Sequence, residues 1–324
     1  MMKTAILAAG VLALLLPFGA AWADTADCTP KLITSLEMID EPDGRVAIKV
    51  TMAGGEHRML LATSAAHSEL FQPFVSTTEF RQFNLPDRKH FYRLGGVAVG
   101  YANVDALMLG TASGAAMQML VSPGPYASDA QVVGVLGADV LANFDLDLDF
   151  KGHRVNLFSS NPCDGKQVYW AANYSQLALI ADGRIATPMV LNGKTLNVDL
   201  DTLAPTLTMR FDVANTVFGL DASSPGLVPA DSENGQPAYH YPFDTLTASG
   251  IDIAKPDVVL VGNPHATLCN GQVHHHLSTV SNQIIGSRCY DGGELTMGMS
   301  QLRTMHLYFA YKAHKLYFTN VKQG

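Results

Sequence analysis

The sequence predicts an all-β protein with two similar lobes, and three observations support this fold class. Hydrophobic residues make up 48% of the 324 positions and charged residues 15%, which provides for an apolar core in each lobe and excludes a disordered chain. The 28 glycines and 16 prolines are spread along the chain, as expected when many short strands are joined by turns. An internal repeat then divides the chain into two copies of one unit.

Residues 1–23 are predicted to be a signal peptide rather than part of the fold. Lys3 provides a positive start, an apolar run extends from Ala5 to Phe18, and Ala21-Trp22-Ala23 fits a small-x-small cleavage site. Cleavage after Ala23 would place the protein in the periplasm or outside the cell and leave no membrane span. An uncleaved anchor helix is the alternative, although the apolar run is short for a bilayer.

The charge balance argues against two kinds of partner. The formal net charge is −8, from 29 acidic and 21 basic side chains. A chain with this balance is not attracted to nucleic acid or to an anionic membrane surface. We therefore expect neither as a partner.

All four cysteines follow the predicted cleavage site. An even number of cysteines in an oxidising compartment favours two disulfides, and four cysteines allow three pairings. We favour Cys28–Cys163, which would tie the mature N-terminus to the end of the first lobe, and Cys269–Cys289, which would close a polar loop in the second. There is no C-x-x-C motif, so a zinc or redox pair is not expected.

The clearest repeat lies late in each half of the chain. Residues 136–155 match residues 297–316 at a constant offset of 161, so that Gly137 pairs with Gly298 and His153 with His314. Each copy predicts a glycine, one helical turn, an alternating strand, a tight Lys-x-His turn and a returning strand.

An earlier repeat has a different offset. Residues 54–65 and 192–204 each predict a hairpin turn, a strand and a turn of small residues, at an offset of 139. The second copy therefore carries 22 more residues between its two elements, and we assign them to the polar segment from Asp221 to Tyr241. The predicted lobes are 24–158 and 173–324, joined by a linker at 159–172.

The repeated motifs resemble a known family. Val135-Leu136-Gly137-Ala138-Asp139 resembles the apolar-apolar-Gly motif of retropepsin-like aspartic proteases, and the second copy differs by having Thr296 in place of Val135. The closing run from His306 to Phe318 is similar to exported bacterial proteins with two retropepsin-like units. The resemblance covers roughly residues 31–320. It implies a bilobal pepsin-like fold, a cleft for an extended peptide or protein segment, and no cofactor or metal.

The resemblance also implies a site in which one residue is missing. The family cleaves peptides with two aspartates, one from the Asp-Thr-Gly turn of each unit, which share a proton. The second unit has Asp201-Thr202 followed by Leu203, whereas the first unit reads Ala62-Thr63-Ser64. An alanine methyl can neither take nor give a proton. We therefore expect impaired catalysis at Asp201, with each threonine bracing the opposite turn.

Other carboxylates do not restore the pair in this interpretation. Asp199 would share a strand face with Asp201 and cannot replace a group from the other unit. Glu56 and Glu69 lie near the first turn, and we expect their side chains to point elsewhere. A turn residue that caps its own loop is the alternative role for Asp201.

The glycine-rich stretch Arg93–Gly100 predicts a flap. A phosphate-binding loop would need a Gly-Lys-Ser/Thr ending and a following helix, and both are missing. A β-hairpin over the cleft fits better, with Gly95, Gly96, Val97 and Gly100 as candidate contacts to a peptide. A plain surface hairpin is the alternative. The corresponding stretch of the second unit would begin at Phe243.

Three further groups of residues favour structural roles. The run His274–His276 is typical of a solvated loop, since three adjacent histidines on a strand cannot all face one metal ion. His67 is too close in sequence to Ser64 and Ser68 for a usual catalytic triad. The alternating residues Asp145, Asp147 and Asp149 predict a solvated strand face, with calcium binding as the alternative.

Three functions remain open at this point. The first is an exported aspartyl-protease-like protein that binds peptides with impaired catalysis, because Ala62 replaces one aspartate. The second is a weakly active aspartic endopeptidase that relies on Asp201. The third is a structural or envelope-interaction protein whose cleft is unused.

Overall fold

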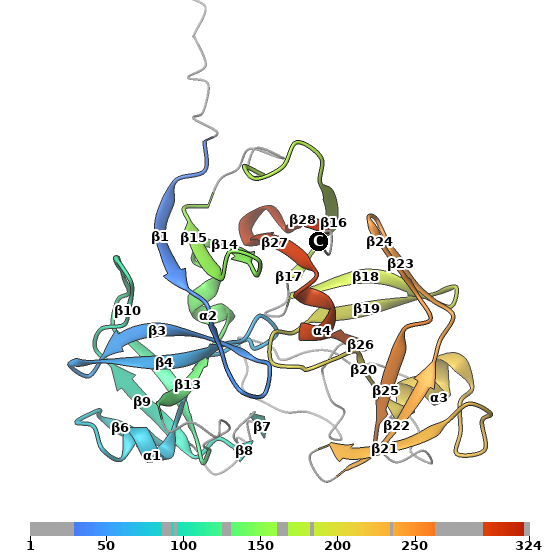
Figure 1. Ribbon diagram of the computed structural model, residues 1–324. Helices are drawn as coiled ribbons and strands as arrows, with labels where there is room; N and C mark the ends of the chain where they lie inside the picture. The colour runs from blue at the N-terminus through green and yellow to red at the C-terminus, as the bar shows by residue number, and fades with distance from the viewer. Residues whose placement is uncertain are drawn as a thin grey trace, which may run out of the picture.

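The computed structural model describes residues 29–85, 92–93, 96–124, 131–160, 168–181, 185–233, 236–262 and 294–320. The predicted signal peptide, the four cysteines, Gly95 and His274–His276 lie outside the described residues. The described part is built mostly of β-strands, which confirms the predicted all-β class (Figure 1). No helix in it combines the length and the apolar character needed to cross a bilayer.

Two ten-stranded sheets form the two lobes (Figure 1). In spatial order the first lobe contains β11 (Ala112–Ser113), β10 (Met108–Leu109), β3 (Val46–Met52), β4 (Gly55–Leu61), β13 (Val132–Leu136), β5 (Glu69–Phe71), β12 (Met117–Ser122), β9 (Gly100–Val104) and β6 (Gln82–Asn84), with β2 (Ile39–Asp40) beside β3. The second lobe contains β21 (Val228–Glu233), β22 (Gln236–Pro242), β25 (Asp257–Val261), β20 (Thr208–Arg210), β26 (Leu295–Met297), β19 (Lys194–Leu200), β18 (Ile185–Leu191), β23 (Thr245–Ala248) and β24 (Ile251–Ala254), with β17 (Ile180–Ala181) beside β18.

A third sheet of six strands joins the lobes. Its order is β1 (Leu32–Glu37), β15 (Arg154–Phe158), β14 (Asp145–Asp149), β27 (Met305–Ala310), β28 (Lys315–Asn320) and β16 (Ser175–Ala178). The short strands β7 (Tyr92–Arg93) and β8 (Gly96–Val97) form a separate hairpin. The remaining elements are α1 (Gln72–Val75), α2 (Ala138–Leu141), α3 (Phe211–Phe218), α4 (Met299–Leu302) and the 3-10 turn η2 (Tyr311–Ala313).

The internal repeat extends to the order and direction of the strands. In the first lobe β13 pairs parallel with β4 and antiparallel with β5, and β5 pairs parallel with β12. In the second lobe β26 pairs parallel with β19 and antiparallel with β20, and β20 pairs parallel with β25. The same sequence of parallel and antiparallel pairs therefore occurs twice.

Local turn chemistry explains why the matched segments fold alike. The hairpin between β3 and β4 turns at Ala53-Gly54, and the one between β18 and β19 turns at Asn192-Gly193, with positive φ at both residues of each pair. Two successive positive φ values are typical of the tight turns that match the twist of a hairpin. His153 and His314 also share a positive φ, of 50° and 53°, in the repeated Lys-x-His turn.

The repeated glycines precede the short helices because only glycine fits there. Gly137 and Gly298 begin α2 and α4, as the repeat predicts. A Cβ atom on Gly137 would lie 2.8 Å from the Ala65 carbonyl oxygen, and one on Gly298 would lie 2.5 Å from the Ala204 carbonyl oxygen. Each glycine therefore lets a small-residue turn pack against the start of its helix.

The predicted position of the insertion is wrong. Most of the segment from Asp221 to Tyr241 forms β21 and β22, which match β6 and β9 in the strand order. The additional length lies between β25 and β26, which are 33 residues apart (262–294), whereas nine residues (123–131) separate β12 from β13. Phe243 leads into β23, the counterpart of β10, so it does not correspond to the predicted flap. The edge strand β21 and its neighbour β22 were missed because their polar, proline-containing sequences have little hydrophobic alternation.

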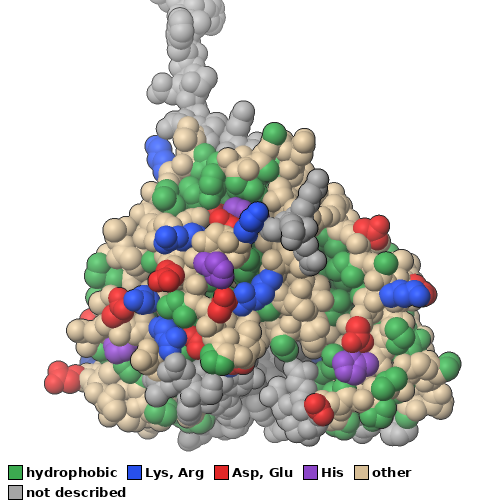
Figure 2. All heavy atoms as spheres, in the orientation of Figure 1, with side chains coloured by type: hydrophobic (Ala, Val, Ile, Leu, Met, Phe, Trp, Pro, Cys, Tyr) green, Lys and Arg blue, Asp and Glu red, His purple; other side chains and the backbone are tan. Residues whose placement is uncertain are grey.

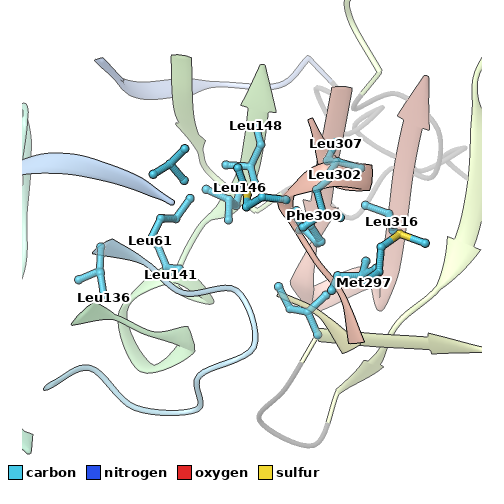
Figure 3. Packing of buried hydrophobic residues seen from close by; sticks show 14 of the residues in the cluster. Leu61, Leu136, Leu141, Leu146, Leu148, Met297, Leu302, Leu307, Phe309 and Leu316 are labelled. Atoms are coloured by element: carbon cyan, nitrogen blue, oxygen red, sulfur yellow. The ribbon is translucent and has the colours of Figure 1, made fainter. Parts of the chain in front are cut away.

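One hydrophobic cluster runs through both lobes instead of two separate cores. It reaches from one lobe to the other along the inner face of the six-stranded sheet (Figure 3). The first half of the chain contributes Leu61, Leu136, Leu141, Leu146 and Leu148, and the second half contributes Met297, Leu302, Leu307, Phe309 and Leu316.

The prediction of a solvated face at Asp145, Asp147 and Asp149 is wrong for the first two. The side chains alternate as expected on β14, but Asp145 and Asp147 are 1% and 0% exposed. They lie on the outer face of the six-stranded sheet, where a second apolar layer is covered by residues near Trp170. Alternation along a strand shows that the two faces of the sheet differ in polarity, whereas the burial of each face depends on which other segments cover it.

The surface and the chain ends add two observations. On the face shown in Figure 2, acidic and basic side chains are interspersed over the first lobe and form no patch of one sign among the described residues. The Ser159 amide donates a hydrogen bond to the Lys31 carbonyl oxygen at 2.9 Å. The segments that lead to Cys28 and Cys163 thus start side by side, while the pairing itself stays a prediction.

Candidate active site

The two small-residue turns meet between the lobes through a reciprocal pair of threonines. The Thr63 amide donates to Thr202 Oγ1, and the Thr202 amide donates to Thr63 Oγ1, both at 3.2 Å. The residues lie 139 positions apart, which is the offset of the early repeat. The two turns therefore face each other as symmetric partners.

Each threonine hydroxyl also donates to the strand that leads into the opposite turn. Thr63 Oγ1 donates to the Leu200 carbonyl oxygen at 2.6 Å, and Thr202 Oγ1 donates to the Leu61 carbonyl oxygen at 2.5 Å. Both threonines are fully buried. Because a hydroxyl has one donor, each hydroxyl uses it on the opposite strand while accepting the opposite amide.

Matched backbone hydrogen bonds place Ala62 and Asp201 at equivalent positions. The Ala62 amide donates to the Leu136 carbonyl oxygen and the Asp201 amide to the Met297 carbonyl oxygen, at 3.0 Å in both cases. The amides three residues later, in Ala65 and Ala204, donate back to the carbonyl oxygens of Ala62 and Asp201. The turn of the first lobe thus has a methyl group where the second lobe has a carboxyl group.

The carboxyl group of Asp201 interacts with both turns. Its Oδ1 atom accepts the Leu203 amide at 2.8 Å. Burial raises the pKa of this carboxyl above its ordinary value of 3.8, although hydrogen bonds from the Leu203 amide, the Ser64 hydroxyl and the Ala204 amide act in the opposite direction. Sequence reasoning missed the contact with Ser64. The signal for it was a hydroxyl residue in the glycine position of the first turn.

Two further carboxylates lie near the seam between the lobes. Asp199 is 6% exposed and lies two residues before Asp201 on β19. Glu69 is 2% exposed and pairs with Val135 across β5 and β13, while Val135 pairs with Leu60 on β4. Because paired residues share a sheet face, Glu69 lies on the same face as Ala62.

The prediction that Glu69 points elsewhere is therefore wrong, although Glu69 does not take the place of Ala62. The strand β13 lies between β5, which contains Glu69, and β4, which leads to Ala62. Because neighbouring strands are about 4.8 Å apart, β5 and β4 are separated by about 10 Å. Glu56 does point away: its side chain is 61% exposed and contacts Lys49 Nζ at 3.0 Å.

Apolar side chains surround Ala62 on its face of the first lobe. A separate buried cluster there consists of Ala47, Leu60, Ala62, Phe71, Val132 and Val135. Leu203 of the second lobe packs against this cluster. The face is thus turned toward the second lobe, next to Asp201.

The glycine-rich residues occupy two different elements. Gly96 and Val97 form β8 in the β7–β8 hairpin, which lies between β6 and β9 along the chain. The matching strands of the second lobe, β21 and β22, are separated by only two residues. Gly100 lies in β9 and pairs with Val121 and Asn84. A Cβ atom on Gly100 would lie 2.4 Å from the Phe83 carbonyl oxygen. A glycine is therefore needed at this position for β9 to pack closely against β6 in the ten-stranded sheet.

Ser68 and His67, considered above for a nucleophile pair, both lie near Asp139. Ser68 Oγ donates to Asp139 Oδ1 at 2.6 Å and accepts the Gly137 amide at 2.9 Å. The His67 side chain is 55% exposed and lies 3.9 Å from Asp139 Oδ2. Within the described ranges, no group of three or more His, Cys, Asp or Glu side chains could hold a metal ion.

The arrangement can hold a proton on one carboxyl group, and within the described part of the chain no second carboxylate stands at the matched position opposite it. General acid and base roles on one water molecule and one carbonyl need two such groups.

A search with the sequence matches no family model and no curated protein.

Proposed function

We propose that this protein is an exported relative of the retropepsin-like aspartic proteases, with the bilobal pepsin-like fold, which binds extended peptides and does not turn them over efficiently. The observation that carries the proposal is the pair of turns joined by Thr63 and Thr202, with Asp201 in one turn and Ala62 at the matched position of the other. Export rests on the predicted signal peptide at residues 1–23.

Loss of one carboxylate accounts for the impaired catalysis. A single general acid or base contributes about 10²–10⁴-fold to the rate, and removing a member of a pair that acts as a unit costs more. The Ser64 hydroxyl interacts with Asp201 but is not a base at neutral pH. Asp201 is thus left as a hydrogen-bonding group at the centre of the seam.

Peptide binding is the activity that the remaining parts support. An extended peptide adds to exposed strands through backbone hydrogen bonds, and its side chains find pockets on alternate sides. The β7–β8 hairpin lies between β6 and β9 along the chain of the first lobe, and we expect such a peptide to lie under this hairpin.

A peptide library at acidic pH tests the proposal against the enzyme alternative. Binding is measured as a rise in melting temperature with library peptides or a pepstatin-type ligand, and turnover by mass spectrometry of the products. We expect binding without turnover. Cleavage that Asp201→Asn abolishes and the exposed-site control Glu56→Gln retains would establish the weak endopeptidase instead. The absence of both binding and turnover would favour a structural role.

Restoring the missing carboxylate tests the assignment of the site. The double variant Ala62→Asp with Ser64→Gly recreates an Asp-Thr-Gly turn opposite Asp201. We expect peptide cleavage to appear in this variant and not in Ser64→Gly alone. A folded double variant that binds peptide and stays inactive would show that the two turns do not form a competent pair.

A further inference from the structure

The segment that follows the first lobe crosses the outer face of the six-stranded sheet. Residues 168–174, which we call the strap, comprise the end of the predicted linker (168–172) and the first two residues of the predicted second lobe. Trp170 stacks on His306 of β27, with ring centroids 4.1 Å apart and an interplanar angle of 5°. The Trp170 indole also donates to Thr319 Oγ1 of β28 at 2.9 Å. Trp170 is thus fixed to the strands that the second half of the chain contributes to this sheet.

The neighbouring residue of the strap contacts a strand that the first half of the chain contributes to the same sheet. The Tyr169 hydroxyl donates to Asp147 Oδ2 of β14 at 2.5 Å. Burial, followed by the neighbouring Asp147 carboxylate, raises the pKa of the Tyr169 phenol, so the hydroxyl remains a donor at neutral pH. Two adjacent aromatic side chains therefore bind the two halves of the same sheet.

Asp147 connects these contacts across the seam. Besides Tyr169, it accepts Asn156 Nδ2 at 2.8 Å and lies 2.5 Å from His306 Nε2. On β14 it stands directly opposite Tyr308, which is its own counterpart at the offset of 161. The carboxylate is fully buried, and a buried carboxylate is tolerated only when hydrogen bonds or opposite charges compensate it. The strap supplies one of these donors.

An apolar layer completes the contact. Phe158 from the first half and Tyr308, Ala310 and Tyr317 from the second form a buried cluster on this face, with Val168, Trp170 and Ala313 packed against it. The strap thus covers a patch to which both halves of the sheet contribute. If the halves rotated against each other, Tyr169 and Trp170 could not both keep their partners.

We propose that the strap is a clamp across the seam between the lobes, and that its release lets the lobes move apart about the β14–β27 pair. The threonine exchange between Thr63 and Thr202 lies on the same seam, where the two lobes meet at their turns. Opening of the clamp should therefore increase the rate at which these two amides exchange with solvent. This role does not depend on peptide binding.

Amide hydrogen exchange of the full-length chain tests the clamp. Trp170→Ala and Tyr169→Phe are compared with Asn173→Ser, a matched control at an exposed position of the strap. We expect the Thr63 and Thr202 amides to exchange about five- to tenfold faster in Tyr169→Phe, which loses one charge-assisted hydrogen bond, and faster still in Trp170→Ala. The amides of Ile48 and Val198, at the centres of the lobes, should keep their rates.

Two results would overturn the proposal. If exchange accelerates only within the strap, the strap covers the sheet without clamping it. If Ile48 and Val198 accelerate as much as the threonine amides, the variants have lost general stability. Should Trp170→Ala fail to fold, Tyr169→Phe carries the test alone, because it keeps the ring.

Tryptophan fluorescence provides a second measurement. The sequence contains two tryptophans, Trp22 and Trp170, so Trp22→Phe leaves Trp170 as the only one. In that background, Tyr169→Phe should make Trp170 more accessible to acrylamide quenching, and Asn173→Ser should not. Equal quenching in Tyr169→Phe and the parent would contradict release of the strap.

Discussion

Replacement of Thr63 by valine tests whether the threonine exchange stabilises the molecule as the geometry requires. Valine keeps the branched shape and removes the hydroxyl, which leaves the Leu200 carbonyl oxygen and the Thr202 amide without their partner. Both groups lie at a fully buried site. An unsatisfied buried group costs about 1–3 kcal/mol, so Thr63→Val should lower the free energy of unfolding by about 2–6 kcal/mol.

The symmetry of the exchange sharpens this expectation. Thr202→Val orphans the Leu61 carbonyl oxygen and the Thr63 amide, so its cost should be close to that of Thr63→Val. Thr63→Ser keeps the hydroxyl and should recover most of the loss. Denaturant unfolding followed by circular dichroism measures all three variants. A loss below about 1 kcal/mol for Thr63→Val, or an equal loss for serine and valine, would refute the reasoning.

Three further predictions concern single residues. Burial raises the pKa of Asp201 above 3.8, so the stability that this group contributes is present at low pH and lost as the pH rises through the raised pKa. Asp201→Asn should therefore make the free energy of unfolding, measured with denaturant, depend less on pH in this range. An unchanged pH profile would contradict the assignment. Thr187 is fully buried opposite Val198 and its hydroxyl has no partner among the described residues, so Thr187→Val should raise the unfolding free energy by about 1 kcal/mol; a loss of stability would count against this account. Gly298→Ala should cost about 1–3 kcal/mol in thermal unfolding because its Cβ would approach two carbonyl oxygens at 2.5 Å, and a neutral effect would show that the turn can shift.

Much of the site could be predicted because the backbone restricts the residue type at each repeated position in the same way in both halves of the chain. The match between Gly137 and Gly298 depends on one close approach of backbone atoms, which restricts the residue type wherever the unit recurs. The same holds for the positive φ at His153 and His314. Because the early repeat aligns Ala62 with Asp201, the difference between the two turns could be predicted before any geometry was known, and the matched backbone hydrogen bonds agree with that alignment.

The errors concern segments whose environment comes from elsewhere in the chain. Asp147 has the alternation of a half-exposed strand and is buried by a strap that follows more than twenty residues later. Glu69 follows the first turn closely, yet its direction was set by its pairing with Val135. The additional residues of the second unit were assigned to the segment that forms β21 and β22, because polarity alone does not distinguish such strands from a loop.

The sequence by itself determined the duplicated β unit, its tight turns and the absence of a second carboxylate at position 62, since each depends on the identity of a few neighbouring residues. Only the tertiary structure decided that the two cores merge into one, that Ser64 contacts Asp201, and that Asp145 and Asp147 are buried. The physical reason is that burial and hydrogen-bond partners across the seam arise from segments far apart in the chain, whose packing no local pattern encodes.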